Sequence, residues 1–574
     1  MTAKRLLSLL AGMTALAGVH PAALAKPGAQ PQPNIVLIVM DDTGYSDFGA
    51  FGSEIRTPNI DALAAGGLRY TRFESRAMCS PTRASLLTGR NNHSIGMADL
   101  TATKLSGGGT GKDSGILAAN AQTLPQVLRA KGYATYAIGK WHLAPDTEDG
   151  AAGNNGNWPL QRGFDYFYGF LPGWDDQYQP TLAEDNRVIG KPTDPTYHFS
   201  RAIVDKAIEK LNGSGDKPAF LYLAFGATHA PIQVPAAYID RYAGVYEKGW
   251  DAIRAERLAR QKRLGIVPAD TMLPPANPGD RAWASLNPVE KQVYARYMAT
   301  YAGFLEHADE QIGRLIQSLK ASGRYDNTLF ILLSDNGAGS EGGARGAFGK
   351  LYPPNHPDPA DLVDKLPQFG KAMIEYQRPW AMASVSPLRR YKAWPYAGGI
   401  RTPMIVSWPG HIADPGGIRR QFVDAIDIAP TLAQAGGASF AAQVNGQRQI
   451  PVAGRSFAGT IASAAAPDPR AVQYFELRGN RAIRQGHWRA VSVHKLGQPF
   501  DADAWSLFDT DRDFAEADDV AAQHPAVIAR LKVLWQQQAA RYGALPLSEG
   551  PAYVRKLDRY RDEFLAPGDD GNGN

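Results

Sequence analysis

The sequence predicts an α/β fold with a large, mixed, mostly parallel central sheet flanked by helices, followed by a small C-terminal α+β subdomain. Four short apolar runs rich in strand-forming residues predict the sheet, and the helical patterns between them favour parallel strands. A change of texture after about Gly437, from apolar runs to a polar stretch rich in Gly and Ala, predicts the subdomain.

Each of the four apolar runs ends in polar, chemically capable residues. The runs are NIVLIVMDDTG (34–44), YATYAIGKWHL (133–143), FLYLAFGATHAPI (220–232) and LFILLSDNG (329–337). Runs of this length are typical of strands that are buried on both faces. The segments TLPQVLRAKG (123–132) and GFLEHADEQIGRLIQSLKASG (303–323) predict two of the helices, and Gly323 is a candidate C-cap of the second.

Two segments before Gly437 are expected to lie outside the sheet. Residues 250–295 read as a helical insertion punctuated by prolines. Residues 340–390 are rich in loop signals and aromatic residues, among them Trp380, and long ordered loops are often functional lids. We therefore expect residues 340–390 to cover a site.

The C-terminal part has its own pattern. After the polar stretch 438–470, the runs AVQYFEL, RAIRQGHWRAVSVH and WSLFDT indicate an antiparallel meander, and a closing helix follows. These signals divide the chain into a catalytic domain at 34–437, a subdomain at 438–545 and a tail at 546–574, of which we expect the final GDDGNGN to be disordered.

Residues 1–25 are typical of a signal peptide. Lys4 and Arg5 precede an apolar run that is too short to span a bilayer comfortably, and Ala23-Leu24-Ala25 fits a cleavage site after Ala25. We therefore expect a soluble periplasmic or secreted protein without stable membrane association. The chain holds one cysteine, Cys79, which cannot form an internal disulfide.

The composition excludes several classes of protein. With 44% hydrophobic and 20% charged residues, the 574-residue chain can bury a large core and is not disordered as a whole. The net charge of +5 is small for this length and no long run of Lys or Arg occurs, so we expect no nucleic-acid partner.

Polar side chains at the ends of the four runs are expected to meet at one edge of the sheet, because ligands of open α/β sheets bind beyond the carboxyl ends of the strands. Any one of these residues could be an ordinary surface or turn residue, but four coincidences on one edge favour a site. The residues are Asp41, Asp42, Lys140, His142, His229, Asp335 and Asn336.

Four of these residues carry oxygen ligands: Asp41, Asp42, Asp335 and Asn336. Carboxylate and amide oxygens without neighbouring Cys or His clusters suit a hard cation, Ca²⁺ or Mg²⁺. Ca²⁺ is favoured because several protein oxygens converge, whereas Mg²⁺ tends to keep its waters.

Cys79 lies in SRAMCSPTRASLLTGR (75–90), where Ser80 is a candidate N-cap and Pro81 a candidate first residue of a helix. At a helix N-terminus a thiolate would be activated, and Arg83 could point back to the same spot. A soft sulfur is nevertheless a poor ligand for a hard cation. An oxygen would suit position 79 better than a sulfur.

The run CSPTR followed by ASLLTGR resembles the signature of the type I sulfatases, in which the cysteine of C-x-P-x-R is oxidised to formylglycine. Five more segments resemble that family in the expected order: DDTG, GKWHL, THAP, SDNG and YKAWPYAGGIRTP (391–403). The loop before Lys392 and RAIRQGHWRA look like the bacterial arylsulfatases, so the resemblance covers nearly all of residues 34–540. It implies an alkaline-phosphatase-like fold and a formylglycine-generating maturation enzyme as partner.

The resemblance also implies a role for each site residue. One Ca²⁺ would be bound by Asp41, Asp42, Asp335 and Asn336 next to the modified residue 79. Arg83 would hold the formylglycine hydrate, and His142, with Lys140 beside it, would act as the base on its second hydroxyl. Lys140, Lys392 and His229 would bind the sulfate, and His229 would protonate the leaving oxygen. The implied reaction is hydrolysis of sulfate esters, aryl sulfates first.

Three other functions compete with this one. A phosphonate monoester or phosphodiester hydrolase of the same superfamily would share the fold and even C-x-P-x-R. A two-zinc alkaline phosphatase needs further His and Asp ligands that are not found grouped here, and an inactive periplasmic binding relative would not need the complete catalytic set. Ala-Pro-Ile follows His229 where related arylsulfatases often carry a bulkier aromatic, which leaves more room beside the leaving group.

Overall fold

The computed structural model describes residues 32–102, 111–148, 150 and 153–550. The predicted signal peptide at 1–25 and the tail from residue 551 onward lie outside the described residues. Among the described helices, none is both long enough and apolar enough to cross a membrane.

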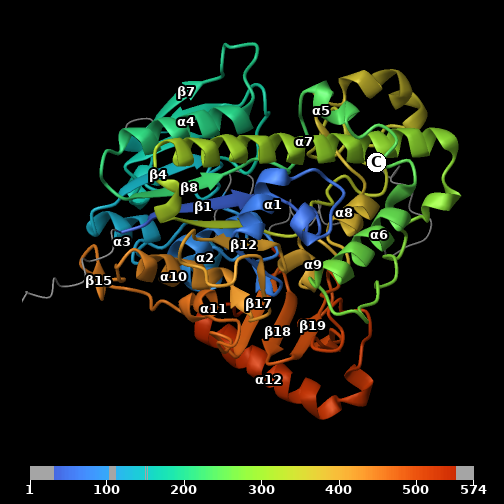
Figure 1. Ribbon diagram of the computed structural model, residues 1–574. Helices are drawn as coiled ribbons and strands as arrows, with labels where there is room; N and C mark the ends of the chain where they lie inside the picture. Colours follow the sequence, from blue (N-terminus) through green and yellow to red (C-terminus); the bar gives the residue numbers. More distant parts are fainter. Residues whose placement is uncertain (1–31, 103–110, 149, 151–152, 551–574) are drawn as a thin grey trace, which may run out of the picture. The chain divides into compact units, whose positions relative to one another are not determined.

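A ten-stranded mixed sheet forms the centre of the structure (Figure 1), as the sequence predicts. Its core is parallel, in the order β9, β1, β8, β4 and β5, and antiparallel pairs extend it on both sides. In spatial order the strands are β13 (Gly417–Arg419), β2 (Leu68–Tyr70), β12 (Met404–Ser407), β9 (Thr328–Ser334), β1 (Asn34–Met40), β8 (Ala219–Ala224), β4 (Ala134–Gly139), β5 (Tyr166–Gly169), β6 (Leu182–Glu184) and β7 (Arg187–Gly190).

The central strand β1 is buried on both faces, which explains its unbroken apolar sequence. Alternate side chains point to opposite faces of a strand. Val36 and Ile38 accordingly join one hydrophobic core, whereas Ile35 and Leu37 join another. The helices of the fold divide between these two cores.

One face of the sheet is covered by α1, α4, α5, α6, α7 and α8, and the other by α2, α3 and α10, as the positions of α4, α7, α3 and α10 in Figure 1 show. The bounds are α1 (Pro58–Ala65), α2 (Cys79–Thr88), α3 (Leu124–Ala130), α4 (Phe199–Gly213), α5 (Ala236–Asp240), α6 (Gly249–Leu264), α7 (Pro288–Ala321), α8 (Arg378–Ser384), α9 (Ala397–Ile400), α10 (Ile428–Ala435) and α11 (Ala458–Ala462).

The helix predicted at 303–323 is the second half of the much longer α7, so the predicted start was wrong. Asn287 caps α7, its side chain accepting from the Glu290 N–H, and Pro288 occupies the first turn. This capping signal is present in the sequence but lies inside the segment that we read as an insertion. The helix stops two residues before Gly323, which has a φ of +68°.

Residues 340–390 are more ordered than their composition predicts. A short antiparallel pair, β10 (Ala347–Phe348) with β11 (Ile374–Glu375), ties the segment together, and α8 follows. The expectation that Trp380 belongs to a lid is wrong. Its side chain is fully buried in the core, and its indole N–H donates to the Tyr294 carbonyl at 2.9 Å.

The predicted C-terminal meander is confirmed as a four-stranded antiparallel sheet in sequence order, β17 (Val472–Leu477), β18 (Asn480–Gln485), β19 (Trp488–Ser492) and β20 (Ser506–Asp509). The closing helix α12 (Pro525–Tyr542) packs on one face through Leu531 and Trp535. The other face packs against Met78 and Cys79. Two short pairs complete the strands, β3 (Phe73–Glu74) with β14 (Val423–Asp424) and β15 (Gln443–Val444) with β16 (Gln447–Arg448).

A buried ionic cluster joins this sheet to the central part of the fold. Arg489 of β19 pairs with Glu74 at 2.8 Å and with Glu516 at 2.7 Å, and Arg401 pairs with Glu74 at 2.9 Å. Burial alone would raise the pKa of Glu74, but Arg489 and Arg401 outweigh it and lower that pKa to about 2. Each charge is therefore compensated although water is excluded.

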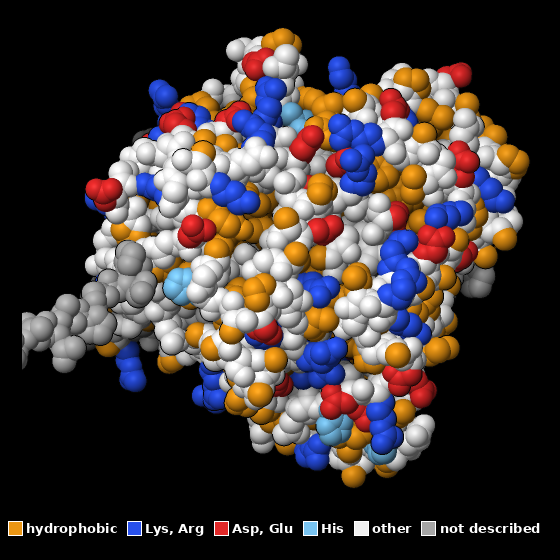
Figure 2. Space-filling view, in the orientation of Figure 1, with side chains coloured by type: hydrophobic (Ala, Val, Ile, Leu, Met, Phe, Trp, Pro, Cys, Tyr) orange, Lys and Arg blue, Asp and Glu red, His pale blue; other side chains and the backbone are white. Residues whose placement is uncertain are grey.

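Charged side chains on the surface are arranged differently. On the face shown in Figure 2, Lys and Arg are interspersed with Asp and Glu. The pair Arg314–Asp205, at 2.6 Å between α7 and α4, is an example with both side chains about half exposed. Exposed pairs of this kind contribute little stability.

We expect Arg489→Met to lower the free energy of unfolding by about 3–5 kcal/mol, because it leaves two buried carboxylates without their shared cation. The matched control is Arg512→Met, whose side chain is 89% exposed and pairs only at 3.8 Å with Asp509; its effect should stay within about 0.5 kcal/mol. Urea unfolding followed by tryptophan fluorescence measures both. Equal effects of the two substitutions would contradict the importance of the cluster.

Candidate active site

The predicted polar residues do meet at one edge of the sheet. Parallel pairing aligns Met40 with Ser334 and Gly139 with Ala224, so the ends of β1, β9, β4 and β8 lie at the same level. The residues that follow these ends are all buried: Asp41, Asp42, Lys140, His142, His229, Asp335 and Asn336.

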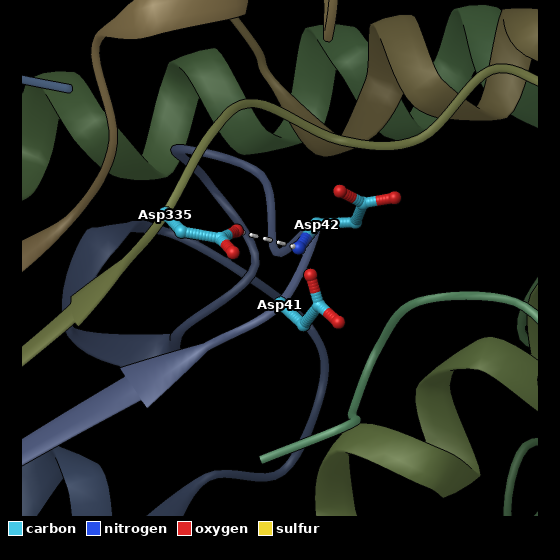
Figure 3. Close-up of side chains that lie close together, drawn as sticks. All are labelled: Asp41, Asp42 and Asp335. Carbon is cyan, nitrogen blue, oxygen red and sulfur yellow. Dashed lines mark hydrogen bonds between the residues drawn. The ribbon is translucent and has the colours of Figure 1, made fainter. Parts of the chain in front are cut away.

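Three carboxylates form the centre of this edge. Asp41 and Asp42 follow β1 and Asp335 follows β9, and Figure 3 shows the dashed hydrogen bond of 3.3 Å from the Asp42 N–H to Asp335 Oδ1. One oxygen of each carboxylate lies within 4.8 Å of the others. Asp42 has a positive φ of +55°, a strained conformation for a residue other than glycine that the two neighbouring strand ends hold in place.

Asn336 completes the oxygen set. Its Nδ2 donates to Asp42 Oδ1 at 2.6 Å, which leaves its Oδ1 without a hydrogen bond in the described structure. Asp41 Oδ1 is likewise buried without one. Two buried oxygens without donors, beside two more carboxylates, are what a hard cation would satisfy.

The electrostatics of the carboxylates agree with this. Burial raises the pKa of Asp41 to about 8 and that of Asp42 to about 6, against the attraction of Lys140 and Lys392. Asp335 differs: burial opposes ionisation there too, but Arg83, Lys140 and Lys392 together outweigh it and lower the pKa. Burial therefore disfavours the ionised forms of Asp41 and Asp42, and a divalent cation such as Ca²⁺, which prefers hard oxygen donors, would stabilise them.

Three cationic side chains surround the carboxylates. Lys140 Nζ lies 2.6 Å from Asp41 Oδ2, and Lys392 Nζ lies 2.7 Å from Asp42 Oδ2. Arg83 Nη2 lies 2.7 Å from Asp335 Oδ2. All three cations are buried, so their charges act almost unscreened on anything bound between them.

Cys79 is the first residue of α2, with Met78 at the N-cap. The prediction that Ser80 caps the helix was wrong, because its hydroxyl instead donates to the His142 carbonyl at 2.9 Å and so joins two parts of the site. The unmodified thiol is not activated by its place at the start of the helix. Cys79 is 2% exposed, and burial raises the pKa of its thiol to about 11 in spite of Lys140 and Lys392.

Arg83 lies one turn further along α2. Its Nε donates to Asp335 Oδ2 at 2.9 Å and its Nη1 to the Lys140 carbonyl at 3.1 Å. Arg83 thus ties α2 to the ends of β9 and β4. It holds the start of α2, with Cys79, against the carboxylates.

The two buried histidines both lie near the charged cluster. The Nδ1 of His229 is 2.6 Å from the Ala230 carbonyl and donates to it, while its Nε2 lies 3.7 Å from Asp42 Oδ2. His142 has a φ of +55° and a buried Nδ1 without a hydrogen bond in the described structure. Burial, together with the nearby lysines, lowers the pKa of both imidazoles, so both are neutral in this state and can accept a proton.

Sequence reasoning missed four residues beside the site. A Cβ at Gly339 would lie 2.9 Å from Asp42 Oδ2, 3.1 Å from Glu341 Oε2 and 3.3 Å from Glu375 Oε1, so two further carboxylates adjoin Asp42. Trp174 and Tyr352 pack with ring centroids 5.4 Å apart. Of the four, Glu341 alone had a local signal, since it stands four residues after the end of SDNG.

The sequence matches the models of two known protein families. Residues 33–438 match the family model described as sulfatase, and residues 390–540 match that of the N-sulphoglucosamine sulphohydrolase C-terminal region. The chain belongs to the sulfatase family. The family resemblance predicted from CSPTR and the ordered motifs is thereby confirmed, and this sulfatase is a sulfuric ester hydrolase.

Individual relatives agree with the family. This sulfatase is 34% identical to an uncharacterized sulfatase of Schizosaccharomyces pombe, over 91% of the chain and 96% of the relative. It is 31% identical to an arylsulfatase of Klebsiella aerogenes, over 83% of the chain and 100% of the relative. Among solved structures, Ps i-CgsB in complex with k-i-k-neocarrahexaose has a TM-score of 0.63 at 24% identity, covering 93% of this chain and 100% of that one, which shows the shared fold.

In protein stripped of divalent cations, we expect Asp41 and Asp42 to contribute a fall in the free energy of unfolding as the pH rises from about 4 to about 8. An unfolded Asp ionises near about pH 4, whereas the folded-state pKa values of Asp41 and Asp42 are about 8 and about 6. The folded state therefore holds more protons in this range, and stability is lost as they leave.

Saturating calcium should abolish much of this loss, because a cation stabilises the ionised carboxylates. Urea unfolding at several pH values, with EDTA and with excess calcium, measures the difference, and the other titrating groups are common to both series. The same pH dependence in both series would rule out a cation at this cluster.

Proposed function

We propose that this sulfatase hydrolyses aryl sulfates to a phenol and inorganic sulfate, with Ca²⁺ at the carboxylate cluster and formylglycine at position 79. The observation that carries the proposal is the arrangement around Cys79, where three buried cations and two neutral imidazoles surround a cluster of oxygen ligands. A sulfate ester is an anion, and its departing oxygen develops further negative charge, so this concentration of positive charge suits both.

The residues that would hold Ca²⁺ are Asp41, Asp42, Asp335 and Asn336, together with an oxygen of the converted residue 79. When bound, Ca²⁺ would supply positive charge to neutralise the sulfate oxygens. The buried thiol of unmodified Cys79, with its raised pKa, is a weak nucleophile at neutral pH and a soft ligand. Both properties favour an oxygen at this position.

A hydrated formyl group at residue 79 would supply an oxygen nucleophile and, through its second hydroxyl, a way to expel sulfate without attack of water on sulfur. Arg83 then holds the start of α2 in register with Asp335. His142 is the base that takes the proton of the second hydroxyl. Its lowered pKa leaves it neutral, as a proton acceptor must be.

Lys140, Lys392 and His229 are the sulfate-binding residues in this proposal. His229 Nε2 is the atom that would pass a proton to the leaving oxygen, because Nδ1 is committed to the Ala230 carbonyl. The lowered pKa of His229 means that it carries this proton only when the negative charge of a bound ester is present. A purely sulfate-holding His229 is the alternative.

Two features favour an aryl leaving group. The Trp174–Tyr352 pair adjoins the site, since a Cβ on the neighbouring Gly173 would lie 2.7 Å from His142 Nε2. Aromatic faces bind flat rings by offset or edge contacts. The second is the similarity to the arylsulfatase of Klebsiella aerogenes, which extends over the full length of that relative.

A phosphonate monoester or phosphodiester hydrolase is the second candidate, because the same cations would bind a phosphate diester. The test is to compare a nitrophenyl sulfate with the matching phosphodiester on pure protein. A higher kcat/KM for the phosphodiester would reverse the assignment.

The proposal further includes export by residues 1–25 to the periplasm or medium, the catalytic domain at 34–437 with the subdomain at 438–545, and a maturation enzyme that converts Cys79.

We expect active protein to carry an aldehyde or its hydrate at residue 79, which intact mass of the peptide 75–90 measures. Cys79→Ala should abolish turnover without loss of fold. Cys79→Ser should release about one leaving group per chain and stop, since a simple ester lacks the second hydroxyl needed for elimination. Fully active protein whose peptide contains only cysteine would refute formylglycine.

We expect His229→Ala to lose about 10²–10⁴-fold in kcat/KM on sulfates of basic leaving groups and much less on nitrophenyl sulfate. A nitrophenolate leaves readily without a proton, whereas a plain phenolate does not. The measurement is kcat/KM for phenyl sulfates of graded leaving-group pKa. If the mutant and the wild type give the same slope, His229 holds the sulfate and Lys392 becomes the next candidate for the acid.

A further inference from the structure

Lys392 forms ion pairs with two carboxylates. Its Nζ is 2.7 Å from Asp42 Oδ2 and 3.0 Å from Glu341 Oε1. The Lys392 and Asp42 side chains are each 3% exposed and that of Glu341 is 11% exposed, so water screens neither ion pair well. Asp42 belongs to the carboxylate cluster, whereas Glu341 does not.

Glu341 is fixed from its own side. Its Oε2 accepts the Ser340 N–H at 2.8 Å, while its Oε1 lies 3.0 Å from the Lys392 Nζ. The backbone N–H of Lys392 in turn donates to the Ala338 carbonyl at 3.1 Å. The segment 338–341 therefore holds Lys392 at both ends, by its backbone and by its ammonium group.

A divalent cation at the carboxylate cluster and the Lys392 ammonium would compete for Asp42. Both are attracted to the same carboxylate, and they repel each other across a few ångströms of poorly screened space. An ammonium group that rests on Asp42 alone therefore weakens the binding of the cation. A second carboxylate within 3.0 Å of the Lys392 Nζ offers the ammonium group another partner and so reduces this conflict.

We propose that Glu341 is a positioning residue that draws the Lys392 ammonium off Asp42, so that Asp42 can ligate the metal while Lys392 faces the sulfate. The role rests on the proposed function, because it needs a cation at the cluster and a sulfate beside Lys392. Glu341 is not among the proposed metal ligands, and in this proposal it acts through its ion pair with Lys392.

A double-mutant cycle read by calcium affinity tests the role, since affinity is measured without turnover. Calorimetric titration of EDTA-stripped full-length protein should show about ten-fold weaker binding in Glu341→Ala, where the ammonium is left on Asp42. In a Lys392→Met background the same substitution should change the affinity by less than about three-fold, because no ammonium remains to compete. Glu341→Gln keeps an acceptor for Lys392 and should restore most of the affinity.

Inhibition by inorganic sulfate is a second measurement, for which the two explanations of Glu341 predict opposite changes in the inhibition constant. If Glu341 positions Lys392, the inhibition constant of sulfate rises about ten-fold in Glu341→Ala, because Lys392 no longer faces the anion. If Glu341 matters only as a nearby negative charge, its removal favours the anion and the inhibition constant falls. A fall in this constant would overturn the proposal.

Glu375→Gln is the matched control, because Glu375 is another buried carboxylate beside Asp42 with no ion pair to Lys392 in the described structure. Its effect on calcium affinity should be the same with and without Lys392. If the wild-type protein binds calcium but Glu341→Ala has the same effect with and without Lys392, the role of Glu341 is overturned and the metal assignment stands. Wild-type protein that binds no calcium would overturn the metal assignment, and the role of Glu341 with it.

Discussion

The structure depends on the compensation of charge in a space that water does not enter. Asp41, Asp42 and Asp335 stand at the ends of two adjacent strands, and isolated carboxylates in such a place would be strongly disfavoured. Lys140, Lys392 and Arg83 reach them from three separate parts of the chain. Each cation must lie next to its carboxylate. This requirement fixes the positions of three segments: the loop after β4, the segment before α9 and the start of α2.

The second requirement is that the carboxyl ends of four strands lie at one level. The parallel core of the sheet meets it, since β9, β1, β8 and β4 are neighbours. Apolar side chains on both faces of β1 hold that register through two separate cores, and a slip by one residue would exchange the faces. Packing far from the chemistry thus determines how closely Asp41 approaches Lys140.

Features with a local signal were predictable from the sequence. The strands were visible as unbroken apolar runs, and Asp41, Lys140 and Asp335 stand directly after them. The start of α7 was missed although Asn287 and Glu290 mark it, because prolines suggested an insertion. Glu375 and the Trp174–Tyr352 pair had no local signal, since only tertiary folding brings them to the site. The raised pKa of the Cys79 thiol could not be predicted for the same reason, because it results from burial beside the C-terminal sheet.

The buried ionic cluster around Glu74 has a consequence for the order in which the molecule is completed. Arg489 Nη2 donates to the Pro395 carbonyl at 2.6 Å, and Glu516 accepts the Ala397 N–H at 2.8 Å, so both grip the backbone just after Lys392. A ribosome makes every charged residue of the site before it makes either of these clamps. A growing chain therefore holds all the charged residues of the site while the backbone just after Lys392 still lacks these two contacts.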